Sequence, residues 1–397
     1  MNKIQASNPF FEIYSTPHGT VPFNLIKTEH YAPAIHEGIR RQNGEIDAII
    51  NNPDTPTFEN TIVPYEKSGE LLHRVNTVFG NLLSAETDDA LQELAREIMP
   101  LMSEHENNIS LNEKLFARIK TVYELADKAK LTPEQSKLLE DIYTGFVRNG
   151  ANLQGNAKEQ YRNLCKELSL LTLQFSENTL KETNDYRLVL TEKSQLSGLP
   201  ESAIDAAAET AQEKGVEGWV FTLHAPSYSP FMTYADNRDL RRELYMAYNT
   251  KCTHDNACNN LEIVKKIANI HMEIARLLGY DNFAEYNLKE RMAQNSDTVY
   301  KLLNQLLEAY TPTAQKEYDE VQALARSEEG ADFILMPWDW SYYSQKLKDR
   351  KFSINDEMLR PYFELSKVKE GVFGLASKLY GITFKKNSDI PVYHKDV

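Results

Sequence analysis

The sequence has few cysteines, no long apolar run and no excess of positive charge. Three cysteines among 397 residues provide no disulfide framework and favour a reduced, cytoplasmic protein. No apolar stretch approaches bilayer length, and the N-terminal residues lack the apolar core of a secretory signal. With 44 Lys and Arg against 58 Asp and Glu, the formal net charge is −14. This charge disfavours nucleic acid or an anionic membrane as the main partner, and is compatible with peptides, small molecules or metal ions.

The sequence also lacks the motifs that mark several common active sites. It contains no G-x-S-x-G elbow, no P-loop and no G-x-G-x-x-G that opens a helix after a strand. No H-E-x-x-H is present, so the two zinc-binding histidines that such a helix offers at i and i+4 are missing. His36 and His271 come nearest, but Arg40 and Ala275 occupy the positions of the second ligand. We therefore expect His36 on an exposed helix face and His271 at the edge of a packed one.

The segment from Cys252 to Cys258 is a further candidate for a metal site. Its two thiols and His254 lie within seven residues, and they could supply three ligands of a zinc ion. No second Cys/His pair lies nearby to complete a tetrahedron. The favoured interpretation is structural, with Asp255 and Asn256 as capping residues for the helix that follows.

Helical periodicity runs through most of the chain. Thr132, Pro133 and Gln135 predict a helix start with a capping hydroxyl, a proline at the first helical position and a capping-box partner. A second capping box is expected at Ser110–Glu113. Apolar residues recur at spacings of three and four, which predicts buried helix faces. They are Leu115, Ile119 and Val122; Leu138, Leu139, Ile142 and Phe146; Tyr161, Leu164, Leu168, Leu171 and Phe175; and Ile263, Ile267, Ile270, Ile274 and Leu277.

A few segments interrupt this helical pattern. Residues 149–155 are expected to form a loop, and Gly279 should end the helix before it. In the middle of the chain, residues 186–190 and 219–223 are short β-rich runs separated by a helical stretch at 200–214. We therefore predict a mainly α fold, an elongated multi-helix body with a small β patch near 186–190 and 219–223.

The C-terminal residues predict an apolar surface without a partner. Val372, Leu375, Ala376 and Leu379 share one face of an expected helix over residues 368–380. Residues 381–384 are predicted to form a strand. An uncovered apolar face and an unpaired strand edge favour aggregation or dimerisation.

The stretch Pro337–Tyr343 combines two tryptophans, an aspartate and two tyrosines. Asp339 is expected to cap a helix that begins at Trp340, and Trp338 should pack against Tyr343 as a hydrophobic staple. Trp340, Tyr343 and Leu347 would then continue a buried face. This interpretation explains the aromatic residues as a helix anchor rather than an active-site wall.

Two neighbouring features were weighed as parts of a site. Tyr342, on the other face of the expected helix, is the candidate for lining a substrate channel. Arg238, Arg241 and Arg242 near Asp239 predict a charged helical surface, and their spacing does not mark an anion site. No residue of the chain is predicted to be catalytic or to bind a metal.

Short segments spread along nearly all of the chain carry a family resemblance. They are Pro56–Ile62 (PTFENTI), Trp219–Pro226 (WVFTLHAP), Leu278–Ala284 (LGYDNFA), Pro337–Tyr343 (PWDWSYY), Leu359–Leu365 (LRPYFEL) and Asp389–His394 (DIPVYH). In this order they resemble the thimet-oligopeptidase family of zinc metallopeptidases, and within it the bacterial peptidyl-dipeptidases, also called dipeptidyl carboxypeptidases.

The resemblance implies both a fold and an activity. The fold would be neurolysin-like, with residues 1–225 as an N-terminal helical region and 226–397 as the first part of the peptidase domain. Zinc held by the HExxH histidines and a further glutamate would hydrolyse short unfolded peptides in a deep channel, and the peptidyl-dipeptidases release C-terminal dipeptides. In the family HExxH follows the segment resembling DIPVYH, whereas this chain ends at Val397. We therefore expect an N-terminal, non-catalytic portion, inactive alone, whose zinc ligands are not in this chain.

Two other interpretations stay open at this point. The chain could be a catalytically dead helical protein that binds peptides or acts as a scaffold. It could also be a helical enzyme with an unrecognised site. An in-frame HExxH downstream of Val397 supports the first interpretation, and a stop codon there supports the second. Peptide hydrolysis by this chain that resists chelators would support the third.

Overall fold

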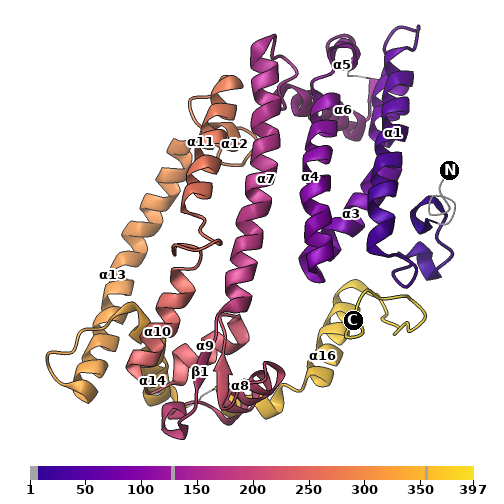
Figure 1. Ribbon diagram of the computed structural model, residues 1–397. Helices are drawn as coiled ribbons and strands as arrows, with labels where there is room; N and C mark the ends of the chain where they lie inside the picture. Colours follow the sequence, from indigo (N-terminus) through magenta and orange to yellow (C-terminus); the bar gives the residue numbers. More distant parts are fainter. Residues whose placement is uncertain (1–7, 127–129, 354–355) are drawn as a thin grey trace. The chain divides into compact units, whose positions relative to one another are not determined.

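The computed structural model describes residues 8–126, 130–353 and 356–397, and these residues are mainly helical (Figure 1). The chain divides into two compact units. Unit 1 comprises Met1–Gln174, Lys265–Asn287 and Lys386–Val397, and unit 2 comprises Phe175–Val264 and Leu288–Lys385. The predicted mainly α fold with a small β patch is confirmed. The boundary expected between residues 225 and 226 concerns the family's domains and stays a prediction.

Unit 1 is built from helices whose apolar faces meet in hydrophobic clusters. One cluster joins α1, α3 and α4, and the fully buried rings of Phe10, Tyr31 and Phe79 lie in it. The ring centroids of Phe10 and Phe79 each lie 5.3 Å from that of Tyr31. The helices are α1 (Tyr31–Ile50), α2 (Val63–Lys67), α3 (Glu70–Ala85), α4 (Asp89–Ser110), α5 (Glu113–Leu125), α6 (Pro133–Arg148) and, in part, α7 (Asn156–Asp185), α11 (Leu261–Leu277) and α12 (Phe283–Leu288).

The Pro56–Ile62 segment has a structural role in a second cluster of unit 1. The Thr57 N–H donates to Asn60 Oδ1 at 2.8 Å, and the Asn60 N–H donates to Thr57 Oγ1 at 3.2 Å. This reciprocal cap starts a single π-helical turn, Phe58–Ile62. Phe58 and Ile62 are buried there with residues of α1, α5 and α6. The segment therefore anchors three helices.

One of the two predicted capping boxes is confirmed and the other is wrong. At the start of α6, the Gln135 N–H donates to Thr132 Oγ1 at 3.3 Å, and the Thr132 N–H donates to Gln135 Oε1 at 3.0 Å. Ser110 is instead the last residue of α4, and Asn112 caps α5. Burial of Leu111 just after α4 extends that helix through Ser110, so the chain leaves it too late for Ser110 to cap α5.

Most of the predicted helix faces are buried. The seam on α7 is buried at Tyr161 and Leu164, but the Phe175 side chain is 37% exposed. Gly279 ends α11 with a φ of +85°, as predicted, because a glycine accepts this left-handed conformation. The loop expected at 149–155 lies between α6 and α7. The other buried members of these faces are Leu115, Ile119, Val122, Leu139, Ile142, Phe146, Ile263, Ile270 and Ile274.

Unit 2 contains the predicted β patch. Strands β1 (Leu188–Leu190) and β2 (Trp219–Phe221) pair antiparallel, with Val189 opposite Val220. Helix α8 (Glu201–Glu213) connects the strands. Helices α9 (Ala225–Tyr234) and α10 (Arg238–Asn249) contribute to the same core, in which Phe221 and Phe231 pack edge to face at 4.6 Å.

The rest of unit 2 is helical and carries much exposed apolar surface. Its elements are α13 (Ser296–Glu329), α14 (Trp340–Phe352), α15 (Asp356–Leu359) and α16 (Leu365–Tyr380). No residue of α16 is buried. The strand expected at 381–384 is wrong, and Phe384 stacks on Phe373 at 4.3 Å instead. Within the described residues β1 and β2 pair only with each other, so this segment meets no strand edge.

The exposed face of α16 suggests a test of self-association. Val372, Leu375 and Leu379 are 59%, 59% and 65% exposed. We expect the pair Leu375→Lys and Leu379→Lys to shift the purified chain towards monomer in sedimentation velocity, because two charges weaken an apolar contact. Glu370→Lys, on the opposite face of α16, is the control and should leave the distribution unchanged. An equal distribution for the double variant and the parent would show that this face does not associate.

Across the described ranges, none of the helices has both the length and the apolar character that crossing a membrane requires.

Candidate functional site

The stretch Pro337–Tyr343 surrounds a fully buried carboxylate. The Asp339 side chain is 0% exposed. Arg238 donates to it through Nε at 3.1 Å and through a terminal nitrogen at 2.7 Å, and Arg241 donates through a terminal nitrogen at 3.0 Å. The Met336 N–H donates to Oδ2 at 3.0 Å. The carboxylate therefore joins α10 to the single 3₁₀ turn Pro337–Asp339 that precedes α14.

Arg241 is buried together with this carboxylate. Only 1% of its surface is exposed. Its guanidinium also donates to the backbone carbonyls of Trp338 at 3.3 Å, Ala235 at 2.7 Å and Asp236 at 3.1 Å. A buried ion pair gains stability only when its remaining hydrogen-bonding groups are satisfied, and here they are. The arrangement holds two segments of unit 2 together.

These contacts correct two predictions. Asp339 does not cap α14, since its side chain makes no capping hydrogen bond to that helix. Arg238 and Arg241 do not form a charged surface, since both bind Asp339, while Arg242 lies over the Trp338 ring at 5.5 Å. The reason is a contact between residues about a hundred positions apart, which local sequence patterns do not reveal.

The tryptophans also differ from expectation. Trp338 packs into the cluster around the sheet, 6.1 Å from Tyr245, whereas Tyr343 belongs to the cluster between α13 and α14. The predicted staple between them is therefore wrong. The predicted buried face holds for Tyr343 at 2% exposed, but Trp340 is 40% exposed. Trp340 stacks instead on the Tyr318 ring at 6.4 Å.

Tyr342, the candidate for lining a channel, lies in the same polar network. It is 6% exposed, and its hydroxyl donates to Asp236 Oδ1 at 2.7 Å. The Arg241 guanidinium lies 4.1 Å and the Lys346 ammonium 4.6 Å from its ring centroid. Burial raises the pKa of Tyr342, and the hydrogen bond to Asp236 adds to this shift. A place in a peptide channel stays a prediction for Tyr342.

The Cys252–Cys258 segment is held by Glu182 of α7. The Cys252 N–H donates to Glu182 Oε2 at 2.7 Å, and His254 Nε2 lies 3.5 Å from Glu182 Oε1. Both cysteines are buried. In the ranges 8–126, 130–353 and 356–397, no group of three or more His, Cys, Asp and Glu residues is arranged to hold a metal ion. The residues present therefore do not fit the zinc that the family implies, and we derive no step through zinc here.

The caps predicted for the helix after this segment are wrong. Asn256 Oδ1 accepts from the Cys258 N–H at 2.8 Å, so it stabilises a turn rather than α11. Asn259 Oδ1 accepts from the Leu261 N–H at 2.9 Å at the start of that helix. Asn260 is buried and donates to the Phe175 carbonyl at 3.1 Å. The helix begins later than expected because this turn extends to Asn259.

The two histidines singled out in the sequence lie where they were expected. His36 is exposed on α1, where Arg40 pairs with Glu37 at 2.7 Å. His271 is half-buried on α11 and stacks on Phe283 with ring centroids 3.9 Å apart. Burial lowers the pKa of His271.

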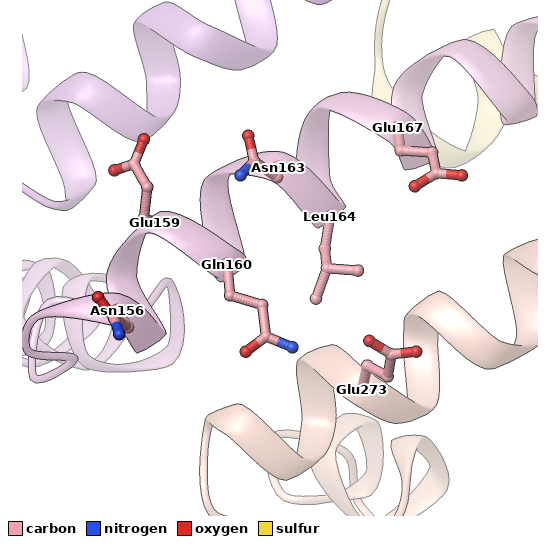
Figure 2. A pocket seen from close by; sticks show the side chains of 7 residues that line it. All are labelled: Asn156, Glu159, Gln160, Asn163, Leu164, Glu167 and Glu273. Atoms are coloured by element: carbon pink, nitrogen blue, oxygen red, sulfur yellow. The ribbon is translucent and has the colours of Figure 1, made fainter.

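A shallow hollow of about 430 Å³ lies in unit 1 beside the start of α7. Its carboxylates come from Glu159 and Glu167 on α7 and from Glu273 on α11, and they lie apart rather than converging on one point (Figure 2). The remaining lining residues are Asn156, Gln160, Asn163 and Leu164. We assign no chemistry to this hollow.

A larger cavity of about 1290 Å³ in unit 1 is lined by residues of α1, α2, α3, α4, α6 and α7. His105 is buried in its wall, with Nε2 2.7 Å from Gln42 Oε1. The sequence offered no signal for this cavity, because its wall residues come from six helices and form no local motif.

Comparison with known proteins identifies similar chains. Residues 231–397 match the family model described as Peptidase family M3. The dipeptidyl carboxypeptidase of Escherichia coli is 35% identical over 392 residues, which cover 98% of this chain and 57% of that protein. Oligopeptidase A of Salmonella typhimurium is 33% identical over 395 residues, with 98% and 57% covered. Saccharolysin of Saccharomyces cerevisiae is 25% identical over 377 residues, with 89% and 52% covered. The chain thus spans somewhat more than half the length of these curated relatives, and the resemblance drawn from the short motifs is confirmed.

Proposed function

From the similarity of this chain to peptidase family M3, we propose that it is the N-terminal, non-catalytic portion of a zinc metallopeptidase acting on short peptides. The observation that carries the proposal is 35% identity to a dipeptidyl carboxypeptidase along 98% of the chain. The 397 residues contain no HExxH. In this proposal zinc, bound by residues outside this sequence, activates the attacking water. No side chain of the present chain would then touch the reacting atoms.

The part that this chain would play is to form and hold a wall of the peptide channel. The family match begins at residue 231, which supports residues 226–397 as the first part of the peptidase domain and 1–225 as a helical region before it. Because Tyr342 is buried, its part would be to position Asp236 and Lys346 rather than to contact peptide. The Asp339 network would keep α10 and α14 in register behind that wall.

Release of C-terminal dipeptides is the finer proposal for the whole protein. Dipeptidyl carboxypeptidase and oligopeptidase A relatives are 35% and 33% identical to this chain, so identity alone does not separate the two activities. For location we propose the cytoplasm. The free state of Cys165, Cys252 and Cys258 supports a reducing compartment.

The proposal is tested by the gene beyond codon 397 and by activity. We expect an in-frame HExxH downstream, and we expect the extended protein to hydrolyse a short peptide in a reaction that a zinc chelator stops. The 397-residue chain should show no hydrolysis with added zinc. Glutamine in place of the motif glutamate of the extended protein is the control for contaminating peptidases. Hydrolysis by the 397-residue chain itself would contradict the proposal.

The products separate the finer alternatives. Mass spectrometry should detect a C-terminal dipeptide from a peptide with a free carboxylate. Cleavage at internal bonds, equally fast with an amidated C-terminus, would indicate an oligopeptidase instead. A stop codon directly after Val397, with peptide binding and no cleavage, would favour the catalytically dead binding protein.

A further inference from the structure

The larger cavity of unit 1 is a polar and apolar pocket that the proposed function does not use. Its volume of about 1290 Å³ exceeds that of many ligand sites. Its apolar surface includes Leu72, Met102, Ile142 and Phe146. Such a mixture of apolar walls with a few placed polar groups is typical of small-molecule sites.

Hydrogen bonds fix one part of the cavity wall. His105 Nε2 lies 2.7 Å from Gln42 Oε1, and Gln42 Nε2 donates to Ser68 Oγ at 3.5 Å. Ser68 Oγ in turn donates to the Tyr65 carbonyl at 2.7 Å. Burial lowers the pKa of His105, so its ring is neutral near neutral pH and adds no positive charge to the cavity. Polar groups held in this way are already ordered before a ligand binds.

Glu106 is the carboxylate that this wall leaves without a cation. It follows His105 on α4 and lines the cavity with Cys165 of α7. Burial raises the pKa of Glu106, and no ion pair among the described residues offsets this cost. Burial also raises the pKa of the Cys165 thiol, which stays neutral and bonds with Tyr161 and Asn107. A cationic group beside Glu106 would recover the interaction energy that burial removes.

The other charged residues of the wall point to the same sign of ligand. Glu66, Glu70, Glu106 and Asp141 line the cavity against Lys67 as the one lysine or arginine of its described lining. The aromatic rings of Tyr65 and Phe146, 5.3 Å apart, add faces that attract a cation.

We propose that this cavity binds a small organic cation, an ammonium group on an apolar body, with Glu106 as its counter-ion. The ammonium pairs with the Glu106 carboxylate, and the body contacts the apolar wall near Met102 and Phe146. Free aliphatic amines and the N-terminus of a short peptide share this chemistry. The site lies within unit 1 and does not depend on the peptidase proposal.

The test is calorimetric titration of the 397-residue chain with n-hexylamine near neutral pH. We expect saturable binding, and affinity about tenfold weaker for Glu106→Gln, since the variant keeps the shape and loses the charge. Glu104→Gln is the matched control, because Glu104 is an exposed residue of α4 outside the cavity lining and should not change affinity. Thermal melting of each variant shows whether the fold is retained.

Two further ligands complete the design. 1-Hexanol, a neutral molecule of similar shape, should bind at least about tenfold more weakly than hexylamine. Leucinamide and its N-acetylated form compare an amino-acid amine with its neutral equivalent, and binding of leucinamide alone would favour a peptide N-terminus as the ligand. No binding of hexylamine, equal affinity for hexanol, or unchanged affinity in Glu106→Gln would overturn the proposal. None of these results bears on the peptidase proposal, because no zinc or catalysis is involved.

Discussion

Replacement of Asp339 by alanine is expected to lower the free energy of unfolding by about 3–5 kcal/mol. The substitution leaves the guanidinium of Arg241 buried at 1% exposure without its counter-charge. Arg238 loses the same partner, but its side chain is 41% exposed and can be hydrated. A helix cap at this position would be worth only about 0.5–2 kcal/mol, so the size of the loss distinguishes the buried ion pair from a cap.

Urea unfolding followed by tryptophan fluorescence measures this loss in the right part of the molecule. All three tryptophans, Trp219, Trp338 and Trp340, lie in unit 2, so their signal reports on the unit that contains Asp339. Asp332→Ala, an exposed aspartate of the same unit, is the control and should change stability by less than about 0.5 kcal/mol.

A charge-free version of the network gives a further check. Replacing Asp339 by Leu together with Arg238→Met and Arg241→Met should recover much of the stability, because no buried charge is then left unpaired. A loss below about 1 kcal/mol for Asp339→Ala would contradict the ion-pair explanation.

Gly218→Ala is expected to cost about 2–5 kcal/mol, the sum of backbone strain and steric overlap. Gly218 has a φ of +97°, which only glycine adopts readily. A Cβ at this position would collide with the backbone carbonyl of Leu190. Since Leu190 pairs with Trp219 in the sheet, the collision would separate β1 from β2.

Gly215→Ala is the matched control for this substitution. Gly215 lies in the same connection with a φ of +65°, but a Cβ there would have nothing within 4 Å. It should therefore cost only about 1–2 kcal/mol of backbone strain. Equal losses for the two variants, measured by urea unfolding, would show that the close approach to Leu190 is unimportant.

The elements that were predicted well are those determined by local patterns. The cap at Thr132, the end of α11 at Gly279 and the β patch depend on residues within a few positions of one another. Their hydrogen bonds form inside one segment, so the segment's own sequence is sufficient. The family resemblance also rests on short motifs, and the comparisons confirmed it.

The elements that were missed depend on residues far apart in the chain. The strand expected at 381–384 required a neighbouring edge that the described residues do not offer. The capping box at Ser110 failed because Leu111 is buried and α4 continues to Ser110. In both cases packing with other segments outweighed a reasonable local preference.

The sequence by itself determined the helical class, the sheet, the acidic charge and the family, because each of these depends on composition, periodicity or a short motif. Only the tertiary structure decided what Asp339, Arg238 and Arg241 do. Their charges were visible in the sequence, but their burial and pairing required α10 to meet the turn before α14. The cavity at Glu106 likewise exists only where six helices surround one space. Burial and long-range contact are properties of the folded chain, and they turned residues expected on a surface and at a helix cap into a buried ion pair.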